Sequence, residues 1–389
     1  MAQYPVGIRS LALTLPSIKR TNDYYKDKYP ELVEQAEQKS LARLFSLAGS
    51  TPINEFDLEM IPYLSDPFRG TVERYVLGAG ETSLTLELQA AKNALEAAKL
   101  SPDDIDLMLV GSIWPEQIGF GNAALLAGQL GLKGAAWNID GACGVTPVTL
   151  QTACALVRAG EYRNVLVVIS CTYSRFFDED DTVSWCMGDA AGAFVIGSLE
   201  VDQGVLGTKT IHTSVLCDTL IPQLTQDKHG NPQIRMKVAK SANRLFREMS
   251  VDLLRTCCEG AVAAAGVTFE EVDFFLFNTA TAWFAKFCTR ALGINQERTI
   301  NLYPQYANIG PALTVANMYY AARLGKIREN DLVLIYGFGV TGVASASVMR
   351  WGKVALSPAP SNIIESDLAL TSSKFPSTAT SAPSACLNK

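Results

Sequence analysis

An internal repeat restricts the possible folds of this chain more than any single motif does. The segment AAKLSPDDID, which begins at Ala97, is echoed by AAGVTFEEVD from Ala264. The segment RAGEYRNVLVVI from Arg158 is echoed by RLGKIRENDLVLI from Arg323, and both echoes have an offset of about 165 to 167 residues. One such similarity can arise by chance, but two in register predict two copies of one α/β unit.

The chain also shows alternating strand and helix patterns. Short apolar runs predict strands at 7–13, 107–111, 165–169 and 205–212, and a glycine-rich bend leads into another at 185–197. Helical periodicity marks 21–48, 84–99, 125–130 and 145–158, whereas 52–68 reads as irregular. Because the strands are apolar throughout and alternate with helices, we expect a layered α/β fold with mostly parallel sheets.

These patterns predict three parts of the chain. The parts are an N-terminal half at 1–203, a C-terminal half at 204–356, and a flexible tail rich in Ser, Pro and Ala at 357–389. The 389 residues are 48% hydrophobic, which is enough for a substantial core. A net charge of −6 gives no reason to expect nucleic acid or an anionic membrane surface as a partner.

The nine cysteines are scattered and lack metal-ligand spacing, so we expect reduced thiols and no metal site. No apolar run reaches the ~18 residues of a membrane span, and the first residues do not resemble a signal peptide. A cytoplasmic protein is therefore expected.

Cys143 is the first candidate for chemistry. An extended piece at 137–140 turns at Gly141, and Cys143 stands where the helix 145–158 begins. The positive end of a helix dipole lowers the pKa of a thiol and makes thiolate available. Gly141 and Gly144 are expected to clear space around the sulfur for a substrate. The alternative is that Cys143 is a small buried residue.

The repeat offset relates this cysteine to two asparagines. Moving from Cys143 by the offset reaches Asn308, and moving from Gly111 at the end of a strand reaches Asn278. Ligands of parallel α/β sheets bind where strands end and helices begin. We therefore expect Cys143, Asn278 and Asn308 to form one site between the halves. A turn or capping role is the alternative for either asparagine.

Several ordered motifs between residues 4 and 351 resemble the thiolase-like condensing enzymes, specifically the β-ketoacyl carrier-protein synthase III group. They are FRGTVERYV, GACG, GDAAGAFVIG, FNTATAWF, QYANIGPAL and GFGVTGVASASVMRW. The resemblance implies a thiolase-like, internally duplicated fold with five layers, αβαβα, and a homodimer. It also implies that Cys143 accepts an acyl group from a coenzyme A or acyl-carrier-protein thioester, with no other cofactor.

The resemblance assigns further roles, with one departure. Family members usually carry histidine where this chain has Asn278, and asparagine at the position of Asn308, so the implied set is Cys143–Asn278–Asn308. The backbone N–H groups of Cys143 and Val340 would form the oxyanion hole. Gly339 and Phe120 would contact substrate, with Phe120 reaching into the pocket of the partner subunit. Asparagine can donate hydrogen bonds but cannot exchange a proton near neutral pH.

Three other polar residues stand out in the sequence. His212 follows a strand where the family lines its pocket, and it is a weaker catalytic candidate, with a satisfied polar residue as the alternative. His229 lies in an evident turn. Asp189 is expected to fix the bend before its strand through backbone hydrogen bonds.

Three functions fit this sequence. The first is an acyltransferase that loads Cys143 and then condenses the acyl group with a malonyl unit or passes it to an oxygen or nitrogen nucleophile. Its expected setting is polyketide or fatty-acid-derived natural product biosynthesis, with an acyl carrier protein as partner. The second is a catalytically reduced subunit of a heteromeric complex, which the missing histidine suggests. The third is a binding module that holds acyl thioesters without turnover.

Overall fold

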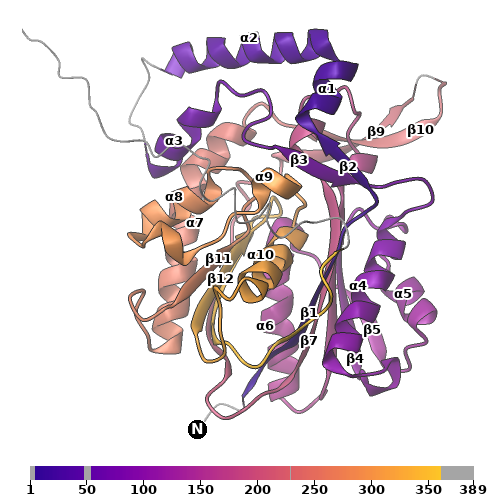
Figure 1. Cartoon of the computed structure of the whole chain (residues 1–389), viewed down its shortest axis with the longest axis vertical. Helices are drawn as coiled ribbons and strands as arrows, with labels where there is room; N and C mark the ends of the chain where they lie inside the picture. Colours follow the sequence, from indigo (N-terminus) through magenta and orange to yellow (C-terminus); the bar gives the residue numbers. More distant parts are fainter. Residues whose placement is uncertain (1–4, 48–53, 228, 361–389) are drawn as a thin grey trace, which may run out of the picture. The chain divides into compact units, whose positions relative to one another are not determined.

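Two mixed β-sheets carry the fold (Figure 1). In the computed structural model, which describes residues 5–47, 54–227 and 229–360, one sheet has six strands in the order β14-β1-β7-β6-β4-β5 and the other has four in the order β11-β12-β13-β8. The first sheet contains β1 (Val6–Thr14), β4 (Leu107–Ile113), β5 (Ala135–Asn138), β6 (Val165–Thr172), β7 (Asp189–Ser198) and β14 (Ala355–Leu356). The second contains β8 (Gly204–His212), β11 (Phe274–Phe277), β12 (Leu332–Phe338) and β13 (Val343–Arg350).

The two sheets share one topology, which confirms the predicted duplication. The order β4-β6-β7-β1 matches β11-β12-β13-β8, and in each series the first pair is parallel and the next two are antiparallel. The repeat extends to single contacts. The Oδ2 atom of Asp106 accepts a hydrogen bond from the N–H of Asn164 (3.0 Å), and Oδ2 of Asp273 accepts one from Leu332 (2.8 Å).

The expectation of mostly parallel sheets is correct for strand direction, except for one strand in each sheet. β7 runs antiparallel to both of its neighbours, and so does β13. The link from β12 to β13 spans only residues 339–342, whereas a parallel connection needs a crossover of about a dozen residues or more. A strand buried on both faces has the same apolar pattern in either direction, so the local sequence could not reveal this.

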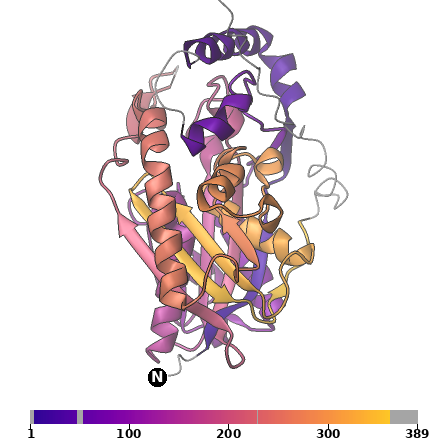
Figure 2. The ribbon, with the colours of Figure 1, turned by 90° about the vertical axis from the view of Figure 1, so that its left-hand side faces the viewer.

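Helices lie outside and between the sheets (Figures 1 and 2). The helix α4 (Ser83–Ala98) packs with α5 (Ala123–Leu130) on the outer face of the first sheet, and α7 (Ala242–Ala265) covers the outer face of the second. Between the sheets lie α6 (Val145–Arg158) and α10 (Ala312–Arg323). This arrangement confirms the five layers, αβαβα. The helix α10 is buried almost all round, as a central layer requires.

The remaining elements surround the carboxyl ends of the strands. They are β2 (Ile18–Thr21), α1 (Asn22–Lys28), α2 (Pro30–Leu47), α3 (Glu55–Met60), β3 (Glu73–Val76), β9 (Leu220–Gln226), β10 (Pro232–Val238), α8 (Phe284–Leu292) and α9 (Tyr303–Tyr306). The helix expected at 21–48 is two helices that part before Pro30. The segment expected to be irregular contains α3, which Asn54 and Asp57 start with a capping box.

The last strand ties the end of the described chain to its beginning. β14 pairs in parallel with β1, and the N–H of Ser357 donates to the carbonyl of Leu11 (3.0 Å). The Tyr319 hydroxyl donates to the carbonyl of Ser357 (2.8 Å). The first residue of the expected tail is therefore anchored, and most of that tail, from residue 361, lies outside the described residues.

Candidate active site

The turn that carries Cys143 has a strained backbone. Cys143 lies in a 3₁₀ turn, Ala142–Gly144, directly before α6. Ala142 has a φ of +47°, a left-handed conformation that costs free energy for any residue with a side chain. The carboxylate of Asp140 holds this turn by accepting from the N–H groups of Gly141 (2.6 Å) and Ala142 (3.1 Å). Ala307, one offset away, also has a positive φ, of +57°.

Glycines let the second half of the chain approach this turn. A Cβ on Gly339 would lie 2.4 Å from the carbonyl oxygen of Gly141 and 2.9 Å from the nitrogen of Cys143. A Cβ on Gly144 would lie 2.8 Å from the carbonyl oxygen of Val343. Gly144 therefore permits close packing against β13. The expectation that it opens space for a substrate is wrong.

The Cys143 thiol is buried, with 8% of the residue exposed. Its Sγ lies 3.6 Å from the hydroxyl of Tyr173. Burial raises the pKa of this thiol, although contacts with the Tyr173 hydroxyl and with its own backbone N–H oppose the rise. The expected lowering of the pKa is therefore wrong, because a helix terminus contributes only about 0.3–1 kcal/mol whereas burial can shift a pKa by several units.

Asn278 clamps the nucleophile turn from the second half. It follows β11 directly and is 3% exposed. Its Nδ2 donates to the carbonyl oxygens of Cys143 (2.7 Å) and Gly310 (3.3 Å). Its Oδ1 is buried and has no hydrogen-bond partner among the described residues. The side-chain amide hydrogens of Asn278 thus bind backbone carbonyls, and the atom left without a partner, Oδ1, is a hydrogen-bond acceptor.

Asn308 is linked to Asn278 through Gly310, which both side chains contact. Its Oδ1 accepts from the N–H of Gly310 (2.9 Å), and its own N–H donates to the carbonyl of Cys186 (3.0 Å). Asn308 therefore has the turn role that was the alternative for it. Because Asn278 contacts both Cys143 and Gly310, the structure brings together the three residues that the offset related.

The remaining candidates have different surroundings. His212 is exposed at the end of β8, in register with Val343. Val340 lies in the turn that Gly342 closes by donating to the carbonyl of Gly339 (2.9 Å). Phe120 is 84% exposed, so its ring covers no pocket within this chain. The catalytic, oxyanion and cross-subunit roles expected for these residues stay predictions.

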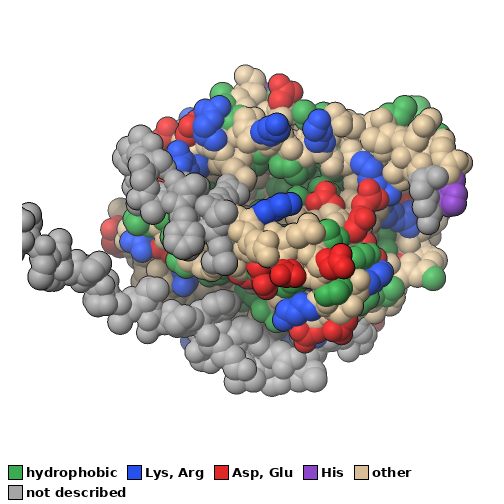
Figure 3. Space-filling model, turned by 90° about the horizontal axis from the view of Figure 1, so that it is seen from above, with side chains coloured by type: hydrophobic (Ala, Val, Ile, Leu, Met, Phe, Trp, Pro, Cys, Tyr) green, Lys and Arg blue, Asp and Glu red, His purple; other side chains and the backbone are tan. Residues whose placement is uncertain are grey.

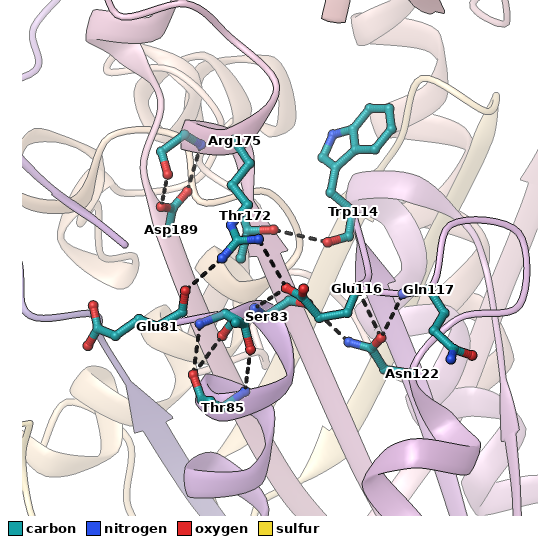
Figure 4. A network of polar contacts seen from close by, with 12 residues as sticks. Glu81, Ser83, Thr85, Trp114, Glu116, Gln117, Asn122, Thr172, Arg175 and Asp189 are labelled. Carbon is teal, nitrogen blue, oxygen red and sulfur yellow. Dashed lines mark hydrogen bonds and ion pairs between the residues drawn. The ribbon is translucent and has the colours of Figure 1, made fainter. Parts of the chain in front are cut away.

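A cleft of about 250 Å³ borders Tyr173, the neighbour of the Cys143 thiol. Its lining includes Arg20, Tyr173, Arg175 and Met187. Arg175 is held at the rim, where it donates to the carbonyl of Glu81 (2.7 Å) and forms an ion pair of 3.5 Å with Glu116 (Figure 4). The face seen in Figure 3 carries basic and acidic side chains together.

Tyr173 was missed by the sequence analysis. It is the first residue after β6, where the strand's carboxyl end meets the site, and it is 2% exposed. The repeat offset could have identified it, because moving back from Gly339 reaches Tyr173. Asp189 accepts backbone hydrogen bonds as expected, but from the N–H groups of Leu77 and Ser174 (2.9 Å each) and not from the bend before β7, so it joins two other segments to this strand.

Two further findings concern the described parts of the chain. Within residues 5–47, 54–227 and 229–360, no three His, Cys, Asp or Glu side chains are grouped so that they could hold a metal ion. Among the helices of those same residues, none is both long and apolar enough to cross a membrane.

Comparison with solved structures identifies the fold class. A synthase III from Thermus thermophilus superposes with a TM-score of 0.71 at 23% identity, covering 89% of this chain and 99% of that one. A variant of OleA from Xanthomonas campestris gives a TM-score of 0.70 at 20% identity, covering 90% and 99%. The chain has the thiolase-like fold, as its resemblance implied.

Sequence comparison narrows this class. Residues 137–214 match the family 3-oxoacyl-(acyl-carrier-protein) synthase III, and residues 262–351 match the family of the synthase III C-terminal part. A beta-ketoacyl-(acyl-carrier-protein) synthase III from Rhizorhabdus wittichii is 30% identical over 290 residues, which are 72% of this chain and 88% of the relative. One from Listeria monocytogenes is 28% identical over 310 residues, or 77% and 95%. The chain belongs to the β-ketoacyl-acyl-carrier-protein synthase III family.

Proposed function

We propose that this chain is an acyltransferase that loads an acyl group from a coenzyme A or acyl-carrier-protein thioester onto Cys143. The observation that carries the proposal is the Cys143 turn, where the buried thiol lies beside the hydroxyl of Tyr173, a residue that lines a cleft, and Asn278 holds the carbonyl of Cys143. A thiol forms a thioester readily, and the transfer needs an oxyanion hole. The N–H groups of Cys143 and Val340 are proposed for that role, and the names of the relatives support an acyl carrier protein as a partner.

We infer that the second step favours an oxygen or nitrogen nucleophile over condensation with a malonyl unit. Decarboxylation of a malonyl thioester develops negative charge that donors stabilise, but the amide hydrogens of Asn278 are held by two carbonyls. Its free Oδ1 is an acceptor, which suits a substrate bearing O–H or N–H. A setting in polyketide or fatty-acid-derived natural product assembly accords with this chemistry.

A homodimer is part of this proposal. The edge strand β5 pairs only with β4 among the described residues, and exposed Ile118, Phe120 and Trp137 belong to the same region. Burying a large apolar side chain is worth about 1.5–3 kcal/mol, so a second copy seated here is favoured. Phe120 would then reach the neighbour's pocket. Light scattering at micromolar concentration should give a dimer, and Phe120→Asp should weaken it; a monomeric unmutated protein contradicts the proposal.

The second candidate is a catalytically reduced subunit that pairs with a complete homologue. The observation in its favour is Asn278, whose amide cannot take up a proton where the family usually carries histidine. Under this function the thiol of Cys143 is not acylated by the isolated chain, and the β5 edge binds the homologue.

Intact-protein mass spectrometry with a panel of acyl-CoA and acyl-carrier-protein thioesters tests the proposal. We expect an added acyl mass that peptide mapping locates on Cys143 and that Cys143→Ala abolishes. Label on Cys154 or Cys171 with Cys143 untouched contradicts it. The loaded protein is then offered malonyl-CoA, amines and alcohols separately. Loss of the acyl mass to an amine or alcohol supports the inferred second step, loss to malonyl-CoA indicates condensation, and no loading with any donor favours the subunit.

A further inference from the structure

The Tyr173 hydroxyl is the proton-bearing group that touches the candidate nucleophile. Its Oη lies 3.6 Å from Sγ of Cys143, and both residues are buried. The hydroxyl also interacts with the thiol of Cys171, so the titratable groups that face it are these two thiols. Tyr173 is also one of the residues that line the cleft, so a single side chain contacts both the cleft and Cys143.

The position of this ring is fixed by its neighbours. Tyr173 begins a 3₁₀ turn, Tyr173–Arg175. The next residue, Ser174, is held in place because both its N–H and its hydroxyl donate to the carboxylate of Asp189. The ring of Phe177 packs edge-on against Tyr173 at 5.9 Å between centroids. A catalytic hydroxyl held in this way needs little reorganisation during a reaction.

Other residues of the site are poorly suited to move a proton. Asn278 carries an amide, and Asn308 uses its oxygen for its own turn. His212 is exposed at the end of β8, and no described contact joins its ring to Cys143. Burial raises the pKa of both Cys143 and Tyr173, so at neutral pH each holds its proton. Loading the acyl group therefore requires the thiol proton to leave during the step.

We propose that Tyr173 is a catalytic residue that relays this proton from Cys143 to the departing sulfur of the donor. This inference rests on the proposed function. The Sγ of Cys143 attacks the thioester carbonyl carbon, a new S–C bond forms, and the C–S bond to the donor breaks. The proton of Sγ passes to Oη while the hydroxyl proton of Tyr173 passes to the donor sulfur. Tyr173 ends neutral, the donor leaves as a thiol, and no oxidant or base is consumed.

The test compares Tyr173→Phe with Tyr336→Phe in single-turnover loading followed by mass spectrometry. Tyr173→Phe keeps the ring and removes Oη. Tyr336 is a matched control because it is fully buried in β12 and its hydroxyl has no partner among the described residues. Proton transfer by a positioned side chain is worth about 10²–10⁴-fold, so we expect Tyr173→Phe to load at least about 10²-fold more slowly at pH 7. Tyr336→Phe should load at the unmutated rate.

Two readouts separate a relay from a packing role. The defect of Tyr173→Phe should shrink as pH rises, because thiolate then forms without transfer to Tyr173. It should also shrink with an aryl thioester, whose departing thiolate is stable and needs no proton. Thermal unfolding of both variants checks that each is folded, and Tyr173→His, which restores a proton carrier, should recover part of the rate.

The outcomes are distinct. If the unmutated protein loads no donor on Cys143, the proposed function fails and the relay fails with it. If the unmutated protein loads and Tyr173→Phe is equally fast, or slower by one constant factor at every pH and with both donors, the proposed function stands and the relay is refuted.

Discussion

Replacing Asn278 by alanine should weaken both the fold and the proposed acylation, and the structure gives the size of each effect. The variant removes the 2.7 Å hydrogen bond to the carbonyl of Cys143 and the 3.3 Å bond to that of Gly310. A buried carbonyl left without its donor costs about 1–3 kcal/mol, and the second bond is long and weak. Removing the unpartnered Oδ1 offsets part of this. We expect the free energy of unfolding to fall by about 2 kcal/mol.

The effect on rate is expected to be larger than the loss of stability alone explains. Asn278 acts on Cys143 through its backbone, so its loss lets the nucleophile turn move rather than removing a donor to the substrate. A displacement of about 1 Å at a reacting group can cost about 10²-fold. We therefore expect acyl loading of Cys143 to slow by roughly 10- to 100-fold, less than the loss of a direct oxyanion contact.

Asn317 offers a matched control. It is fully buried in α10, and its Nδ2 donates to the carbonyl of Phe277 (2.8 Å) and to the hydroxyl of Thr279 (3.1 Å). Its Oδ1 also has no partner within the described residues. Asn317→Ala therefore removes similar bonds from the two residues that flank Asn278 but keeps the amide that holds Cys143, so it should lose similar stability and slow loading much less than Asn278→Ala does.

The assay is chemical denaturation for stability and single-turnover mass spectrometry for loading, with all three proteins at one pH. Equal slowing of loading in Asn278→Ala and Asn317→Ala would show that general destabilisation accounts for the effect. Full activity in Asn278→Ala would refute the reasoning outright.

Three other perturbations test the site. The alkylation rate of Cys143 by iodoacetamide should rise about tenfold per pH unit and still be rising at pH 9, because burial raises the thiol pKa above its ordinary 9.0; a plateau near pH 7 would contradict this. Burial raises the pKa of Asp189 from 3.8 to about 6. The protonated carboxyl therefore stabilises the fold fully below pH 4, and this stabilisation is lost as the pH rises through 6. The free energy of unfolding should fall by about 3 kcal/mol over this range. Denaturation from pH 4 to 7 should show this fall in the unmutated protein, and an equal fall in Asp189→Asn would assign it to other groups. Gly339→Ala places a Cβ 2.4 Å from the carbonyl oxygen of Gly141 and should cost about 3 kcal/mol in a thermal or chemical melt, whereas Gly128→Ala, which meets no atom within 4 Å, should be neutral or stabilising.

The local sequence predicted the bounds of a helix well where a residue that starts or stops helices flanks each of its ends. The helix after Cys143 has the predicted bounds, because Gly144 precedes it and Gly160 follows it. The repeat offset predicted the meeting of Cys143 with Asn278, since pseudo-equivalent strand ends meet between the halves. The capping box of α3 is a local signal too, because Asn54 and Asp57 stand three residues apart in the sequence.

The errors arose from properties that depend on the folded whole. The direction of β13 is set by the short connection at 339–342 before it, and the apolar run of a buried strand such as β7 does not indicate a direction. The pKa of Cys143 depends on burial by residues far along the chain, which outweighs the nearby helix terminus. Tyr173 drew no attention because its importance comes from the thiol that the fold places beside it.

The short strand β14 makes the two halves of the chain depend on each other. The chain leaves the second sheet after β13, returns to the first, and completes the edge of β1, the strand with which it began. A fragment cut between β7 and β8 would leave that edge of β1 bare and expose the packing faces of α6 and α10 to water. We expect unfolding to be cooperative across both halves, with a single transition, and separately produced halves to regain structure by fragment complementation only when mixed.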